Sequence, residues 1–236
     1  MKKVATIAAK ELGIFFKSPI AYIVLVITIS VFNVFFFLII DQNREASLRD
    51  MFKLMEFMFV FILPLLTMKI FAEEKRSGTI EFLMTSPVGN TAIVLGKYLG
   101  ALLFFTVILL FTSVYYFIIE YFSEPDRWAI VAGYLGIWLE GALFIAIGIL
   151  MSSWTKNQII AAMSSYLILF SFYFSISFIK YFDAATQGII KHASFWSHTE
   201  NFVAGLFTLE DLIYYVSGIF FFIALTRLSI ENKIWK

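Results

Sequence analysis

Residues 20–40 read IAYIVLVITISVFNVFFFLII, an apolar run of 21 residues in which no side chain carries a charge. A helix that crosses the hydrocarbon core of a bilayer needs about 20 such residues. Inside lipid the backbone amides must bond within their own segment, whereas the strands of a membrane barrel would alternate in polarity over about ten residues. The run shows no such alternation, and it therefore predicts a transmembrane helix.

The composition of the chain extends this prediction to most of its length. Of the 236 residues, 61% are hydrophobic, 19% aromatic and 15% charged, whereas soluble domains average roughly 45–50% apolar and about 25% charged residues. This composition argues against a water-soluble fold. The absence of cysteine excludes disulfides and thiol nucleophiles, and a net charge of +1 gives no basic excess for nucleic acid.

Six apolar runs are expected to cross the membrane, which predicts an all-α polytopic membrane protein with a single domain, residues 1–236. The predicted spans are residues 20–40, 55–71, 98–119, 129–151, 159–179 and 212–228. Pro64 lies near the middle of the second span and predicts a kink there, because proline lacks the N–H of a helix interior. Residues 180–211 carry spaced aromatic side chains and are expected to form an external segment that packs against the membrane or re-enters it.

The lysine and arginine residues predict the orientation, because they are retained on the cytoplasmic side of a membrane. With the N-terminus inside, twelve of them are cytoplasmic: Lys2, Lys3, Lys10, Lys17, Lys69, Lys75, Arg76, Lys97, Lys156, Arg227, Lys233 and Lys236. Six are external: Arg44, Arg49, Lys53, Arg127, Lys180 and Lys191. An even number of spans places the C-terminus on the same side, so both termini are expected in the cytoplasm.

The first 18 residues have the pattern of an amphipathic helix that lies on the membrane surface. One arc of that helix is apolar: Val4, Ile7, Ala8, Leu12, Phe15 and Phe16. The lysines recur every seven residues on another side, at positions 3, 10 and 17. Ser18-Pro19 then ends the helix and turns the chain into the first span. A simple basic anchor that follows the charge bias of the inner leaflet is an equally good interpretation.

The connection between the second and third spans is the most informative polar stretch. Residues 71–88 read FAEEKRSGTIEFLMTSPV, which predicts a charged helix end, a break at Ser77-Gly78 and a short new helix that Thr79 can cap. That helix would stop at Ser86-Pro87, and Asn90 or Thr91 would cap the third span. A short rigid helix that exposes Glu81 and buries Ile80 and Leu83 is a shape on which another protein can push.

Glu140 is an ionisable residue near the middle of the fourth span. Such residues are rare inside membranes and often functional, because an isolated charge there costs about 2.5–3.5 kcal/mol on insertion scales. Two interpretations remain open. Glu140 and Asn33 could line a translocation path, or Glu140 could be a structural group that is protonated or bonded to Ser152 or Asn33.

No pattern for nucleotide or metal binding accompanies these residues. Six residues separate Gly89 from Gly96-Lys97, where a phosphate-binding loop needs four, and no Ser or Thr follows the lysine. His192 and His198 are six residues apart, which is not the i, i+4 spacing of two ligands on one helical face. We therefore predict no catalytic, cofactor-binding or metal site.

From Glu74 to Pro87 the chain fits E-x-x-x-G-T-I-E-x-L-x-T-x-P without a gap, and Leu95-Gly96-Lys97-Tyr98 follows. In these motifs, and along nearly its whole length, the chain resembles the type-2 ABC export permeases, which include the nitrous-oxide-reductase maturation permeases. Among them it is most similar to the gliding-motility permeases. The likeness extends more weakly to His198, Phe202, Gly205 and Asp211-Leu212.

The resemblance implies a coupling helix at residues 78–85, which docks on an ATPase subunit, and a connecting helix at residues 1–18 that contains Lys10 and Glu11. The coupling residues that it implies are Glu74, Arg76, Gly78, Thr79, Ile80, Glu81, Leu83, Thr85 and Pro87. It also implies a bacterial cytoplasmic membrane and a second permease copy or a related permease chain as partner.

The expected function is that of a permease subunit. It would couple ATP hydrolysis in a separate subunit to export, or to mechanical work in a gliding or secretion machine. The alternative is a stand-alone secondary transporter. Such a transporter would show paired broken helices and several intramembrane polar ligands in two related halves, whereas only Pro64, Asn33 and Glu140 are seen, without a repeat.

Overall fold

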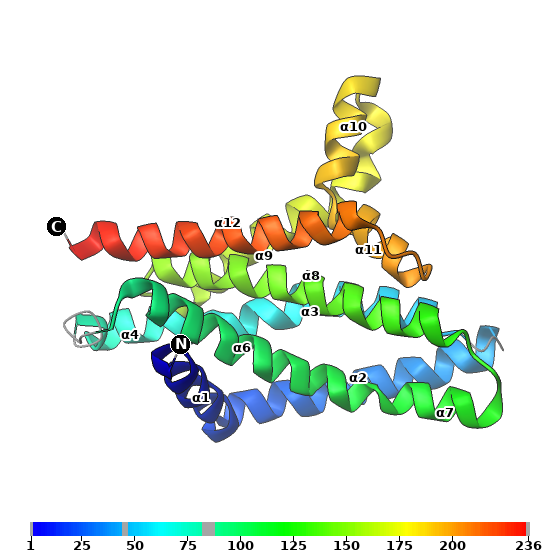
Figure 1. The fold of residues 1–236 in the computed structure, drawn as a ribbon, viewed down its shortest axis with the longest axis horizontal. Helices are drawn as coiled ribbons and strands as arrows, with labels where there is room; N and C mark the ends of the chain where they lie inside the picture. Colours follow the sequence, from blue (N-terminus) through cyan, green and yellow to red (C-terminus); the bar gives the residue numbers. More distant parts are fainter. Residues whose placement is uncertain (1, 44–46, 82–87, 235–236) are drawn as a thin grey trace.

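The computed structural model describes residues 2–43, 47–81 and 88–234, and over these residues every regular element is a helix (Figure 1). The helices are α1 (Lys2–Lys17), α2 (Pro19–Asn43), α3 (Arg49–Thr67), α4 (Lys69–Ser77), α6 (Asn90–Thr112), α7 (Val114–Phe122), α8 (Arg127–Trp154), α9 (Gln158–Ser175), the 3-10 helix η1 (Ile176–Tyr181), α10 (Ala184–Ala193), α11 (Phe195–Val203) and α12 (Leu209–Ile234). The predicted all-α class is confirmed.

Within the described residues, six helical stretches are long and apolar enough to cross a membrane, as predicted. They are Pro19–Gln42, Arg49–Arg76, Asn90–Phe122, Arg127–Trp154, Gln158–Tyr181 and Leu209–Glu231. Each predicted span lies inside one of them. Two of the helices extend past a charged side chain because its charge is neutralised. Lys97 is buried against carboxylates instead of marking a helix end, and Arg227 pairs with Glu231 at 2.8 Å one turn later in α12. The third span also begins at Asn90 with Gly89 as its N-cap, so neither Asn90 nor Thr91 is the cap.

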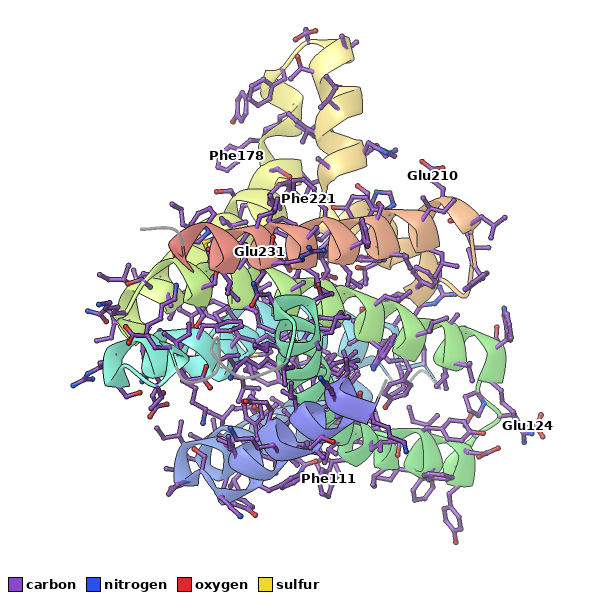
Figure 2. All side chains as sticks on the ribbon, turned by 60° about the vertical axis from the view of Figure 1, so that its left-hand side comes forward. Phe111, Glu124, Phe178, Glu210, Phe221 and Glu231 are labelled. Atoms are coloured by element: carbon purple, nitrogen blue, oxygen red, sulfur yellow. The ribbon has the colours of Figure 1, made fainter. Side chains whose placement is uncertain are left out.

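Helix α8 is the central element of the bundle. In its most apolar 18-residue window 89% of the residues are buried, against 17% in α2. Its glycines lie where neighbouring helices come close: an added Cβ would meet Phe52 at Gly133, Phe202 at Gly136, Phe105 at Gly141 and Thr67 at Gly148, each within 2.5 Å. Small residues allow this close approach in membrane bundles. On the outer surface, by contrast, large side chains are exposed: Phe111, Phe178 and Phe221 point away from the bundle (Figure 2).

The second span is interrupted once, four residues after Pro64. Helix α3 continues through Pro64 and ends at Thr67, and Met68 donates its N–H to the Pro64 carbonyl at 2.9 Å before α4 begins. The hydroxyl of Ser152 on α8 donates to the Met68 carbonyl at 2.8 Å and accepts the N–H groups of Phe71 and Ala72 at 3.0 Å. The end of α8 thus satisfies the backbone groups at the break, as buried polar groups require.

The N-terminus, the C-terminus and α4 lie toward one end of the bundle, and α7 and α11 lie toward the other (Figure 1). Residues 180–211 contain the helices α10 and α11, which differ in how they contact the bundle. Helix α11 packs on α8, where Phe195 meets Phe144 with ring centroids 5.1 Å apart. Helix α10 has no buried residue and stands out from the bundle with η1 (Figure 1).

Candidate functional site

Lys97 on α6 is the centre of a buried ionic cluster that joins three helices. Its Nζ lies 2.8 Å from Oε1 of Glu11 on α1 and 2.7 Å from Oε1 of Glu74 on α4, and it donates to the Ile70 carbonyl at 3.2 Å. All three donors of the ammonium group are therefore used. The Lys97 side chain is 1% exposed, and its Nζ lies 5.2 Å from the centroid of the Phe71 ring.

Two glycines of α6 bring α1 close enough for this contact. Gly96 and Gly100 are four residues apart and so lie on one face of α6. A Cβ added at Gly96 would lie 2.5 Å from Cβ of Ile7, and one added at Gly100 would lie 2.5 Å from Cβ of Glu11. The absence of side chains at these two positions lets α1 rest on the α6 backbone, with Glu11 next to Lys97.

The apolar arc predicted for the first helix faces α6. Ala8 and Phe15 are buried, and Phe15 stacks on Phe104 of α6 with ring centroids 4.9 Å apart. Lys3, Lys10 and Lys17 are exposed. Of the two residues named for the connecting helix, Glu11 belongs to the cluster and Lys10 is exposed.

A second lysine fastens the same helices. Lys69 at the start of α4 donates to the Ser18 hydroxyl at 3.0 Å and lies 5.2 Å from the centroid of the Phe15 ring. Between α1 and α4 lies a pocket of about 250 Å³ whose lining includes Glu11, Glu74 and Lys97. These contacts hold α1, α4 and α6 together as one unit at the end of the bundle that carries the termini.

The cluster contains one positive and two negative charges. Glu11 is 7% exposed and Glu74 is 19% exposed, and Oε2 of Glu74 is buried without a hydrogen-bond partner among the described residues. Removing one member of such a group leaves an uncompensated buried charge, which is strongly destabilising. The arrangement is suited to holding helices in register.

Helix α4 is also fastened to α8. The buried Lys75 donates to the Ser153 carbonyl, beside the Ser152 contacts with the α3–α4 break. Arg76 is exposed in the last turn of α4, where a positive charge is favourable beside the helix C-terminus. Helix α4 is thus bonded to α1 and α6 through Lys97, and to α8 through Ser152 and Lys75.

The predicted coupling segment begins directly at the end of α4. Gly78 has φ +72°, the left-handed conformation that ends many helices, and the Ser77 and Thr79 hydroxyls lie 2.9 Å apart across it. Ile80 packs against the core and Glu81 is exposed. Leu83, Thr85 and Pro87 lie outside the described residues.

Glu140 lies at the centre of α8, but neither of its suggested partners reaches it. The Ser152 hydroxyl is used at the α3–α4 break, and Asn33 accepts a hydrogen bond from the Tyr115 hydroxyl at 2.8 Å. The neighbour of Glu140 is instead Glu56 on α3, whose carboxyl lies within hydrogen-bonding reach. Among the described residues no hydrogen bond joins Glu140 to Asn33, and their role in a translocation path stays a prediction.

Sequence reasoning missed both Lys97 and Glu56 as site residues. Lys97 lies between two glycines four residues apart in an apolar helix, a pattern that indicates a close helix contact beside a charge. Glu56 is one turn from Phe52 and from Phe59, which are both buried. Helical spacing therefore places its carboxyl on the inward face.

His198 is buried in a polar group on the α11 side of the bundle. Its Nδ1 lies 2.5 Å from Oδ1 of Asp211, its Nε2 lies 2.9 Å from the His192 carbonyl oxygen, and its ring stacks on Tyr214 with centroids 3.9 Å apart. Asn201 donates to Oδ2 of the same aspartate at 2.9 Å. In the part of the chain that the structure describes, no group of three His, Cys, Asp or Glu side chains could hold a metal ion.

Comparison with known proteins gives one family. The family model described as ABC-2 family transporter protein matches residues 5–213. The match includes Glu11, Glu74 and Lys97 and ends in the first turns of α12. No curated protein matches the chain.

Proposed function

The chain belongs to the ABC-2 transporter family, and from this premise we propose that it converts the movement of a separate ATPase subunit into movement of its own spans. Membership of this family makes it a multi-pass membrane permease component of an ABC transporter and not itself a catalyst. We propose the ATPase partner, its docking residues and the transmission path.

The Lys97 cluster is the observation that carries the proposal. It joins the N-terminal helix, α4 and α6 through charged contacts of 2.8 and 2.7 Å, and α4 runs directly into the segment 78–85 on which the ATPase is proposed to dock. A push on that segment would act on α4 first. From there it would pass to α1 and α6 through Lys97 and to α8 through Ser152, because packed elements shift between discrete arrangements rather than deform continuously.

The wider assembly is proposed on the same basis. Two copies of this chain, or this chain and a related permease, would form the membrane part of an exporter in a bacterial cytoplasmic membrane, with both termini and the ATPase inside. The positions of the two termini near α4 agree with this topology (Figure 1), as does the excess of basic residues predicted on that side. The same helix movement would drive either the export of a substrate or mechanical work in a gliding machine.

Charge reversal at Glu81 tests the docking surface. The side chain is exposed, so Glu81→Lys should leave insertion and expression unchanged. It should weaken recovery of the ATPase in a pull-down, because a rim charge acts on encounter and register. Glu124→Lys, also exposed but at the opposite end of the bundle, is the matched control (Figure 2).

Gly78→Val tests the orientation of the segment. Its φ of +72° is strained for a β-branched residue, so this variant should lose stimulation of ATP hydrolysis even where the ATPase still binds. Both variants are compared with wild type at matched membrane levels. If neither changes ATPase binding or stimulation, the docking assignment is wrong.

A further inference from the structure

Two carboxyl groups face each other inside the bundle. Glu56 on α3 is 2% exposed and Glu140 on α8 is 1% exposed, and their carboxyls lie within hydrogen-bonding reach. Oε1 of each residue is buried without a partner among the described residues. Glu140 is 13 residues from the start of α8, which places it roughly 20 Å from either end of that helix.

The charges around this pair do not neutralise it. Lys53 and Glu200 act on Glu56 with opposite signs, and Lys53 is 46% exposed and bonded to Asp50 at 3.4 Å. In the described part of the chain the other titratable neighbours are phenols: Tyr173 on α9 and Tyr214 and Tyr215 on α12. None of these groups supplies a buried positive charge.

Two carboxylates in contact in such a place are strongly unfavourable. Like charges repel more as the dielectric constant falls, and each charge also loses its hydration. One bound proton removes the repulsion and leaves a single buried charge, because the protonated carboxyl can donate its O–H to the other carboxylate. We propose that Glu56 and Glu140 form a proton-binding site inside the membrane domain, which exchanges with the solvent at the α11 end of the bundle.

Polar groups mark the route of exchange. The Thr199 side chain on α11 lies within hydrogen-bonding reach of Glu140, and its hydroxyl lies 2.6 Å from the Tyr215 hydroxyl. The preceding residue in α11 is His198, which is bonded to Asp211. His198 and Asp211 line an open pocket together with Glu210, and the Glu210 side chain is 71% exposed.

Infrared difference spectroscopy of the full chain in lipid nanodiscs tests the site. Wild type minus the double variant Glu56→Gln/Glu140→Gln should contain the C=O stretch of a protonated carboxyl, which shifts in D₂O and is lost in the double variant. Glu120→Gln, at the charge paired with Arg127 on the outside, should keep that band. A difference spectrum with carboxylate bands alone overturns the proposal.

Two further measurements cover the cases in which the double variant does not fold or the pair binds a metal cation instead of a proton. If the double variant does not fold, each single variant should shift the band, because the O–H then donates to an amide; an unshifted band in both contradicts the shared proton. Replacing choline by Na⁺ at constant ionic strength should leave the band in place. Its loss would show that the pair holds a monovalent cation and would overturn the proton site.

The rate at which D₂O shifts the band tests the route. Thr199→Val should slow this exchange at least several-fold, because it removes the hydroxyl next to Glu140. The control is Thr226→Val, a buried threonine near the other end of α12 whose hydroxyl bonds only to the Phe222 carbonyl among the described residues. Equal rates in wild type and Thr199→Val contradict the route.

Discussion

Lys97→Met should destabilise the protein strongly, and the size of the effect follows from the geometry of the cluster. At 2.8 and 2.7 Å, each contact with a carboxylate is an attraction of about 6 kcal/mol at an effective dielectric constant of about 20. The cost of removing the three charges from water offsets most of that attraction. Methionine has nearly the volume of the lysine side chain, so the measured loss would report the two carboxylates left without a cation, about 3–5 kcal/mol.

Chemical denaturation in detergent, followed by tryptophan fluorescence, measures this loss. Lys10→Met is the matched control, because Lys10 is an exposed lysine one residue from Glu11 on the same helix, and it should change stability by less than about 0.5 kcal/mol. The triple variant Lys97→Met/Glu11→Gln/Glu74→Gln should recover most of the loss, since no buried charge is then unpaired. The electrostatic argument is refuted if Lys97→Met matches Lys10→Met, or if the triple variant is no more stable than the single one.

Three further predictions address α1, α10 and the topology. Gly100→Ala should cost about 1–3 kcal/mol by pushing α1 away from α6, whereas Gly13→Ala, where an added Cβ meets nothing within 4 Å, should not destabilise in the same denaturation assay. The Thr186 hydrogen bonds lower the pKa of the exposed Asp183 carboxyl, which caps α10. The cap is therefore present above the ordinary carboxyl pKa and is lost as the pH falls through the lowered value, so NMR shifts of α10 should titrate in wild type but not in Asp183→Asn. A cysteine at Ser77 should resist a membrane-impermeant thiol reagent in intact cells, and its labelling there would reverse the proposed topology.

Apolar run length made most of the fold predictable, because backbone amides in lipid leave a long apolar segment no alternative to a helix. The break at Gly78 was equally accessible, since glycine between a charged helix end and a new capped turn indicates a left-handed residue. The contacts between side chains of different helices could not be predicted in the same way. Helical spacing tells which face of α6 carries Lys97, but only the packing of α1 on Gly96 and Gly100 brings Glu11 to it.

Glu56 is a second residue whose partner could not be predicted from the sequence. A carboxylate one residue inside the edge of a predicted span resembles a charge at a helix end, and only the longer helix beginning at Arg49 places it well inside the bundle. Its importance comes from Glu140, which is 84 residues away in the sequence. A pair of this kind depends on the register of α3 against α8, which local pattern does not determine.

The two proposed sites lie on different helices that meet at the α3–α4 break. Helix α3 carries Glu56 and leads into α4 at Met68, and α8 carries Glu140 and holds that break with Ser152. Both carboxyls are twelve residues from this contact along their own helices, a distance of about 18 Å in each case. If docking of the ATPase moves α4 relative to α8, the two helices would change the separation of the carboxyls and so the affinity of the pair for a proton. Linkage is reciprocal, and a proton bound at the pair would then favour one position of α4 by the same free energy.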